Sequence, residues 1–250
     1  MRELRVFHVA RPGVGMGSAV VSPDAELANL AAYDLWAQTY PPVPHNALMR
    51  AEQQAMLALW PELGGRRALD LACGTGRYAQ LLEERGAAFV VATDLSPAML
   101  AHSSVRQRVR ADMMQLPFAD ASFDFVVSGL AVGHAPSLDH WMREVARVLA
   151  PGGVLLYSDF HPEAARAGMT RSFTDTRSRR HTLLHCNYDL AAHRAAGAAA
   201  GLQLDVVHEV RVGEDLREAF EGSQDFYRRW AGLPVVLVLR AVKAAVHASR

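Results

Sequence analysis

The feature that most constrains this chain is the stretch 68–77, which reads ALDLACGTGR. Apolar residues up to Asp70 predict a buried strand, and the residues that follow predict a tight turn and then a helix. Gly74 and Gly76 stand in the turn, where glycine lets the backbone approach a ligand that a Cβ would block. A strand, a glycine turn and a helix in this order are typical of nucleoside-binding sites in doubly wound α/β proteins.

The acidic residues that follow stand where further strands are expected to end. Ala79 stands where a dinucleotide fingerprint has its third glycine, an exchange that such fingerprints sometimes allow. The acidic residue before the turn and the single short loop nevertheless favour a cofactor without a pyrophosphate. Asp94 ends the apolar run 89–93, about 20 residues after the glycines, where a ribose-binding carboxylate belongs. Asp112 ends the next run, and its carboxylate could accept a hydrogen bond from an exocyclic amine such as that of adenine.

Strands and helices are expected to alternate along the chain. The pattern predicts strands at 67–71, 89–93, 107–111, 123–128 and 153–159, with helices at 76–86, 97–104 and 138–149. Such alternation is typical of a parallel sheet with helices on both faces. Helices at 23–40 and 45–63, the second opened by Asn46, are expected to cover the cofactor mouth. A helix at 190–200 and strands at 204–212 and 235–241 follow, and residues 1 to about 24 are expected to form a loose arm.

Five motifs in the central part of the chain resemble those of a known enzyme family. They read DLACGTG, DLSPAML, ADMMQLPF, SFDFVVS and LAPGG, and they lie between Arg66 and Phe160. In this order they are similar to the successive motifs of class I S-adenosylmethionine-dependent methyltransferases. Within that superfamily the chain resembles the quinone-biosynthesis-like and biotin-synthesis-like small-molecule methyltransferases, the latter also in SGLAVGH at 128–134. The resemblance implies a Rossmann-like α/β fold with a seven-stranded, mostly parallel sheet, an antiparallel C-terminal hairpin and an N-terminal helical cover.

The resemblance also implies S-adenosyl-L-methionine as the cofactor. The backbone around Gly74 would hold its methionine part, Asp94 its ribose hydroxyls, and Asp112 its adenine. The segment YDLWAQTY at 33–40 resembles a helix that many members lay over the sulfonium and carboxylate. Plain packing is the alternative for the two tyrosines, core filling for Met99, and an exposed surface position for Arg50. The expected cofactor residues are Tyr33, Tyr40, Arg50, Asp70, Ala72, Gly74, Gly76, Asp94, Leu95, Met99, Asp112, Met113 and Leu130.

Methyl transfer is an in-line displacement, and because the sulfonium already supplies the leaving group, a dedicated base is optional. His134 is the best candidate for such a base, since it follows the fourth strand and imidazole titrates near neutral pH. The alternative is that it only orients a loop or donates a hydrogen bond. The acceptor is expected to meet residues at the end of the fifth strand and in the long connection 161–189. These residues are Tyr157, Asp159, His161, Arg171 and His185.

The connection 161–189 is locally basic, whereas the chain as a whole carries 26 basic and 26 acidic residues and a formal net charge of zero. The basic connection indicates either an anionic acceptor or a solvated lid surface. The neutral chain disfavours nucleic acid as a partner. Cys73 and Cys186 form no paired motif, so neither a disulfide nor a metal site is expected. Without a long apolar run or a signal peptide, we expect a soluble, cytoplasmic monomer or homodimer that does not bind membranes.

We therefore expect one domain over 1–250, divided into an N-terminal arm and cover (1–64), a cofactor-binding core (65–160), an acceptor lid (161–189) and a C-terminal helix and hairpin (190–250). Three functions fit this sequence. The first is a methyltransferase that acts on oxygen, nitrogen or carbon of a small metabolite. The second is a methyltransferase whose acceptor is a carboxylate on a carrier protein. The third is a protein that binds S-adenosylmethionine without transferring its methyl group.

Overall fold

The computed structural model describes residues 7–9, 23–220, 227–228 and 230–245. Its main sheet has seven strands in the order β4-β3-β2-β5-β6-β10-β9. Neighbouring strands from β4 to β6 run parallel, while β10 runs antiparallel to both β6 and β9. The strands are β2 (Arg67–Leu71), β3 (Phe89–Asp94), β4 (Gln107–Arg110), β5 (Phe123–Ser128), β6 (Leu149–Phe160), β9 (Leu202–Arg211) and β10 (Pro234–Lys243). The expected fold is therefore confirmed.

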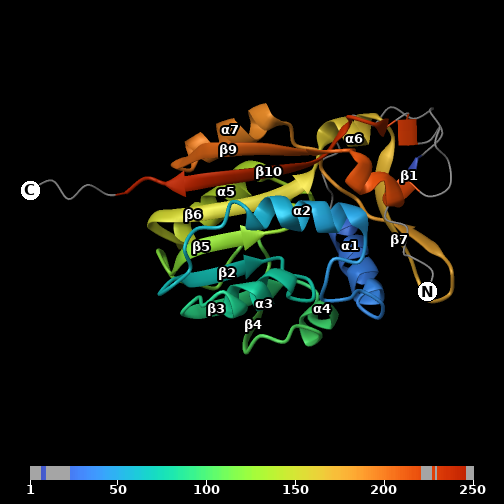
Figure 1. Ribbon diagram of the computed structural model, residues 1–250. Coiled ribbons are helices and arrows are strands. Elements are labelled where there is room, and N and C mark those ends of the chain that lie inside the picture. The colour runs from blue at the N-terminus through green and yellow to red at the C-terminus, as the bar shows by residue number, and fades with distance from the viewer. Residues whose placement is uncertain (1–6, 10–22, 221–226, 229, 246–250) are drawn as a thin grey trace, which may run out of the picture.

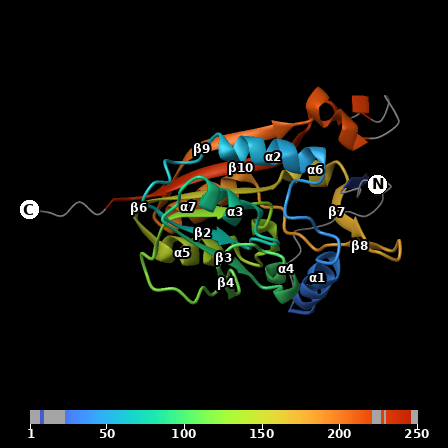
Figure 2. The same ribbon diagram turned by 60° about the horizontal axis from the view of Figure 1, so that its bottom comes forward.

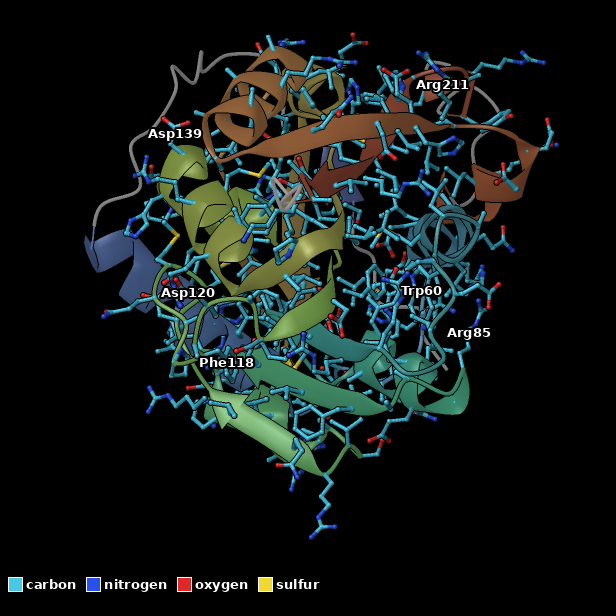
Figure 3. All side chains as sticks on the ribbon, turned by 90° about the vertical axis from the view of Figure 1, so that its left-hand side faces the viewer. Trp60, Arg85, Phe118, Asp120, Asp139 and Arg211 are labelled. Atoms are coloured by element: carbon cyan, nitrogen blue, oxygen red, sulfur yellow. The ribbon has the colours of Figure 1, made fainter. Side chains whose placement is uncertain are left out.

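Helices cover both faces of the sheet (Figure 1). One face carries α2 (Ala47–Leu57) and α3 (Arg77–Glu84), and the other carries α5 (Leu138–Val148) and α7 (Leu190–Ala199). The side chain of Asn46 caps α2 by accepting a hydrogen bond from the Met49 amide, as the sequence predicts. Figure 3 views the sheet from one end, with Trp60 and Arg85 on the side of α2 and α3 and Asp139 on the side of α5.

Each face of the sheet has its own hydrophobic core because side chains alternate along a strand. In β10, Val236 and Val238 pack on the α2 and α3 side, whereas Leu237 and Leu239 pack on the α5 and α7 side. All four are at most 2% exposed. The apolar run of β10 therefore fills both cores, as expected for a strand covered on both faces.

A second, three-stranded sheet lies beyond the carboxyl ends of the parallel strands, beside the helix α1 (Pro23–Trp36), as Figure 2 shows. It consists of β1 (Phe7–Val9), β7 (Met169–Thr174) and β8 (Arg180–Thr182), in the order β1-β7-β8. The prediction of a loose arm is thus wrong for residues 7–9, which pair with β7; residues 1–6 and 10–22 lie outside the described part. The short helices α4 (Pro97–Ala101) and α6 (Pro162–Arg166) and the 3-10 turns η1 (Val132–His134) and η2 (Glu214–Phe220) complete the elements used below.

The connection 161–189 also contains regular structure that the sequence analysis does not predict. It begins with α6 and continues as the β7–β8 hairpin. Trp36 of α1 stacks on Phe173 of β7, with ring centroids 4.6 Å apart and planes 4° from parallel. This contact packs the hairpin against the N-terminal helix. No helix in the described part of the chain is long and apolar enough to cross a membrane.

Candidate functional site

A cavity lies where the parallel strands β2, β3 and β5 end, the usual ligand position in an open α/β sheet. It encloses about 1120 Å³ of space that protein atoms do not fill, part of which is open to solvent. Thirteen of the predicted site residues line it: Tyr33, Tyr40, Asp70, Ala72, Gly74, Asp94, Leu95, Met99, Asp112, Met113, Leu130, His134 and Arg171.

The glycine turn after β2 brings its backbone directly to the cavity. Ala72 and Gly74 both have positive φ angles, 54° and 56°, so the chain turns sharply. A Cβ added at Gly74 would meet no other atom within 4 Å, because that side of the residue faces open space. The turn therefore leaves room for a ligand against the main chain.

Gly76 has a different role from the one predicted. It precedes α3 with φ of 83°, and a Cβ there would lie 2.3 Å from Oγ of Ser103. It does not line the cavity. Gly76 is thus required for the packing of the turn against the loop after α4, and the prediction of a direct cofactor contact is not supported.

Carboxylates at the ends of neighbouring strands face the cavity. Asp94 ends β3 and accepts hydrogen bonds of 2.8 Å from the amides of Gly74 and Ser96. These bonds fix the carboxylate beside the glycine turn, and burial raises its pKa. Asp112 follows β4 and accepts a bond of 2.8 Å from the Met114 amide. Each carboxylate keeps lone pairs for a further donor, since an ionised carboxylate offers about four acceptor sites.

Asp70 is 1% exposed, and its Oδ2 accepts a hydrogen bond of 2.7 Å from the Ala79 amide. Burial raises the pKa of Asp70 to about 7, although this hydrogen bond and Arg77 oppose the rise. The residue joins the end of β2 to the first turn of α3, and so it shapes the glycine turn from behind as well as lining the cavity.

Opposite the glycine turn, His134 lies in a cluster that closes the cavity. Its Nδ1 is 3.1 Å from the carbonyl oxygen of Leu184, which can only accept, so Nδ1 carries the hydrogen. Its Nε2 then accepts from Tyr33 Oη at 2.8 Å and from Arg171 Nη1 at 3.0 Å. Burial, followed by Arg171 and His185, holds the pKa of His134 well below its usual value. His134 is therefore neutral, and both of its ring nitrogens are engaged.

Arg171 reaches the cavity from β7. Its Nη1 donates to the Leu130 carbonyl oxygen at 2.5 Å as well as to His134, and its guanidinium lies over the rings of Tyr33 and Phe160, 5.8 and 5.3 Å from their centroids. Among the described residues, no carboxylate forms an ion pair with Arg171. A half-buried cation without a counter-ion in the described part of the chain creates a positive field in this part of the cavity.

The structure places Arg50 away from the cavity. It lies on the exposed side of α2, so the prediction that it contacts the cofactor is not supported. Arg77, which the sequence analysis passed over, lines the cavity instead. Its position directly after the glycine turn is the signal that could have identified it.

Arg77 belongs to a buried network centred on Glu52, which is 0% exposed. Glu52 accepts hydrogen bonds from Arg77 Nη2 at 2.9 Å, from Tyr78 Oη at 2.9 Å and from Ser158 Oγ at 2.5 Å. Ser158 Oγ in turn accepts from the Leu130 amide at 2.9 Å. The network thus joins α2, α3, β6 and the cavity loop after β5. Glu52 and Ser158 carry no motif that the sequence alone could have revealed.

The remaining predicted acceptor residues lie behind the cavity wall. Tyr157 is fully buried against Trp141, with its hydroxyl 3.2 Å from Nδ1 of His193. His161 caps α6 by accepting from the Glu163 amide. Neither residue lines the cavity: Tyr157 packs in the core with Trp141, and His161 lies directly after the end of β6. Their contact with the acceptor therefore stays a prediction that the cavity lining does not support.

Asp159 and His185 pair with each other behind His134. Asp159 Oδ1 is 2.8 Å from Nε2 of His185, and the His185 ring packs edge-on against that of His134, with centroids 5.5 Å apart. They do not line the cavity. Their contact with the acceptor therefore stays a prediction, and the contact that the structure shows is that of the His185 ring with His134. No group of His, Cys, Asp and Glu among the residues that can be described is arranged to hold a metal ion.

Comparison with known proteins agrees with this geometry. A family model for a methyltransferase domain matches residues 69–157. A malonyl-[acyl-carrier protein] O-methyltransferase of Enterobacter lignolyticus is 38% identical over 131 residues, 49% of this chain and 52% of that protein. A demethylmenaquinone methyltransferase of Thermus thermophilus is 38% identical over 110 residues, 40% of this chain and 50% of that protein. The chain thus spans about half the length of these relatives.

A solved structure supports the same assignment. An S-adenosylmethionine-dependent methyltransferase from Mesorhizobium loti superposes with a TM-score of 0.62 at 25% identity, covering 77% of this chain and 98% of that one. The matched region holds the glycine turn and the strand-end carboxylates that line the cavity. The cofactor of this family is S-adenosyl-L-methionine. Residues 69–157 of the chain thus match a methyltransferase domain, and the chain is similar in fold to a solved S-adenosylmethionine-dependent methyltransferase.

Proposed function

We propose that this protein transfers a methyl group from S-adenosylmethionine to an anionic acceptor, most simply a carboxylate. The observation that carries the anionic part is Arg171, whose guanidinium faces the cavity beside His134 and has no described carboxylate partner. Arginine is well suited to bind a planar anion because its guanidinium offers several donors in one plane.

The residues around the glycine turn fit the cofactor. The open space beside Gly74 accommodates a ligand against the main chain, and the bonds that Asp94 accepts leave lone pairs for two ribose hydroxyls. Asp112 and Met113 would hold the adenine, with Leu95 and Met99 along its faces. We assign the methionine end to the backbone at Ala72 and Leu130, where the positive φ of both residues turns the chain around the cavity.

When bound, S-adenosylmethionine supplies a methyl group on a sulfonium, which is already a good leaving group. The protein then has to align the acceptor and exclude water. Tyr33 and Tyr40 of the N-terminal cover line the cavity and would close it over the methyl group. Burial keeps the Tyr33 hydroxyl protonated by raising its pKa.

The state of His134 also favours an acceptor that needs no deprotonation. Its Nε2 accepts from Arg171, which can only donate, and its pKa is low, so a proton on Nε2 would set two donors against each other. A carboxylate has no proton to lose at neutral pH. We therefore infer that His134 orients Tyr33 and Arg171 and does not act as a base.

Carriage of the carboxylate by an acyl-carrier protein is the second candidate. It is favoured by the Enterobacter relative, whose name specifies a malonyl group on such a carrier. The basic residues Arg177 and Arg179, exposed at the tip of the β7–β8 hairpin, could face an acidic carrier. Malonyl-carrier protein and small free carboxylates are thus the two sources of the same acceptor chemistry.

The test is formation of S-adenosylhomocysteine with three sets of probes: small carboxylates, malonyl-carrier protein and neutral amines. We expect turnover with one of the two carboxylate sets. Arg171→Met should raise the acceptor KM at least ten-fold while leaving cofactor affinity within two-fold. Arg67→Met is the matched control, because its guanidinium pairs with Asp124 at the amino ends of the strands, away from the cavity lining and from the hairpin tip. Turnover of amines only, unaffected by Arg171→Met, would overturn the anionic assignment. Tight cofactor binding without turnover of any probe would favour a binding protein.

A further inference from the structure

Asn29 is a buried amide on α1, 9% exposed, that the sequence analysis does not single out. Its side chain pairs with both backbone groups of Leu184. This residue lies in the stretch 183–186 near the end of the acceptor lid 161–189, and we call this stretch the lid segment. Nδ2 donates to the Leu184 carbonyl oxygen at 2.8 Å, and Oδ1 accepts from the Leu184 amide at 3.0 Å. Such two-point pairing fixes the two peptide groups on either side of the Leu184 Cα at once.

The Leu184 carbonyl oxygen receives a second donor, Nδ1–H of His134, at 3.1 Å. Asn29 Nδ2 and His134 Nδ1 lie 3.2 Å apart because both donate to this one oxygen. Asn29 therefore decides where the acceptor for Nδ1–H is held. The hydrogen on Nδ1 in turn leaves Nε2 as an acceptor on the cavity side, where Tyr33 and Arg171 donate to it.

Asn29 and Tyr33 are one helical turn apart on α1 and lie on the same face of the helix. Tyr33 contacts Nε2 of His134 directly, and Asn29 reaches its Nδ1 through Leu184. The two residues hold the imidazole from opposite sides. The lid segment is attached to the same loop by the Cys186 amide, which donates to the Gly133 carbonyl oxygen at 2.7 Å.

We propose that Asn29 is a positioning residue, which fixes the ring orientation and the Nδ1–H tautomer of His134 through the Leu184 backbone and so joins the N-terminal cover to the lid segment. The proposal rests on the proposed function only for the role of Nε2, which is to orient Tyr33 and Arg171 at the cavity. The hydrogen-bond arrangement itself can be tested without turnover.

The first measurement is the 15N spectrum of histidine-labelled protein with S-adenosylhomocysteine, with the His134 signals assigned by His134→Gln. We expect a protonated Nδ1 and an unprotonated Nε2 in the unaltered protein. Asn29→Ala should shift His134 toward a mixture of both tautomers. Asn29→Gln should have the same effect although it keeps an amide, because the longer side chain places the amide one methylene too far out to pair with both Leu184 groups. Leu184→Ala is the matched control, since the Leu184 side chain is 47% exposed and only its backbone takes part.

The second measurement is hydrogen exchange of the Leu184 amide. We expect exchange at least ten-fold faster in Asn29→Ala, and unchanged exchange in Leu184→Ala and in Asn29→Asp, which keeps an acceptor for this amide. A protonated Nε2 in the unaltered protein, or His134 signals that stay the same in both Asn29→Ala and Asn29→Gln, would overturn the proposal. Neither readout depends on an acceptor, so a failed search for turnover leaves this test intact.

Discussion

Two walls of the cavity use the chain in opposite ways. The strand-end wall, formed by Ala72, Gly74, Asp94 and Asp112, comes from consecutive βα units within about 40 residues of sequence. Its groups are backbone atoms and carboxylates fixed by the sheet. The cover wall, formed by Tyr33, His134 and Arg171, comes from three segments that meet only in the folded protein. The first wall is thus a property of the fold, whereas the second depends on contacts between side chains that are far apart in the sequence.

The comparison teaches where specificity can change. A wall made of main chain and strand ends can vary little without changing the sheet itself. A wall made of distant side chains can change its acceptor by single substitutions. Changes in the strand-end wall should therefore alter cofactor affinity alone, and changes in the cover wall should alter the acceptor and the state of His134.

The largest effect is expected for Gly74→Val. A branched side chain there would fill the open space beside the turn and would have to adopt φ of 56°. We expect binding of S-adenosylmethionine and S-adenosylhomocysteine to fall more than a hundred-fold in calorimetry. Gly86→Val is the control, since Gly86 also has a positive φ and no neighbour within 4 Å but lies after α3, outside the cavity lining. Tight binding by the Gly74 variant would contradict the assignment of the strand-end wall to the cofactor.

A smaller loss is expected for Asp94→Asn. The variant keeps an oxygen for a backbone amide but loses the charge that strengthens a hydroxyl contact, and bonds to charged groups are worth about 1.5–3 kcal/mol. This corresponds to about a ten- to hundred-fold weaker affinity for S-adenosylhomocysteine. Asp124→Asn is the control, because Asp124 pairs with Arg67 at the amino ends of the strands. Equal losses in the two variants would remove the ribose assignment from Asp94.

Asp70→Asn should show a pH-dependent gain in stability. The folded pKa of about 7 lies above the usual value, so the folded protein binds more protons than the unfolded chain between about pH 4 and 7. Wild-type stability is then lowered as the pH rises through this window, and the cost is complete above pH 7. Asparagine carries no such cost and can still accept from Ala79. We expect the variant to melt several degrees higher at pH 8, on the order of 3 kcal/mol, and the gain to vanish near pH 4. A gain that does not change with pH would contradict this account.

The smallest effect concerns the cover wall and is a shift in one pKa. Burial is the main cause of the low pKa of His134, and Arg171 is the second. Arg171→Met should therefore raise that pKa while leaving it below its usual value. The 15N signals of His134, followed in both proteins as the pH is lowered, would show which imidazole takes up its proton at the higher pH. If the titration in the variant matched that of the unaltered protein, Arg171 would not face the imidazole and would not belong to the cover wall.

The strand-end wall could be predicted closely from the sequence. The run to Asp70, the glycines and the acidic residues at 94 and 112 follow from strand periodicity and from where parallel strands end. The ends of the elements also agree, since β2 and β5 have the predicted bounds and most others differ by one to four residues. Sequence position is enough here because residues at the ends of neighbouring parallel strands meet at the same edge of the sheet.

The cover wall could be predicted only in part, because its contacts are not local. Tyr33, His134 and Arg171 were found as candidates, but nothing in the sequence places them within one hydrogen bond of each other. Asn29, Glu52 and Ser158 were missed because isolated amide, acid and hydroxyl residues on helices and strands carry no motif. Tyr157 and His161 were expected at the acceptor but do not line the cavity, since alternation along a strand does not predict which face meets the cavity, and β6 ends before His161.

The fit of Gly133 against the lid has a consequence for how such a chain can evolve. A Cβ at this position would lie 2.1 Å from Nε2 of His185, a ring that Asp159 holds in place. The φ of Gly133 is not among the positive ones, so it is the neighbouring ring and not the backbone that excludes alanine. Related sequences with a larger residue at position 133 should therefore carry a smaller residue at position 185. The carboxylate at position 159 would then have no imidazole to bind and could also change. Positions 133, 159 and 185 should thus vary together, although they lie far apart in the sequence.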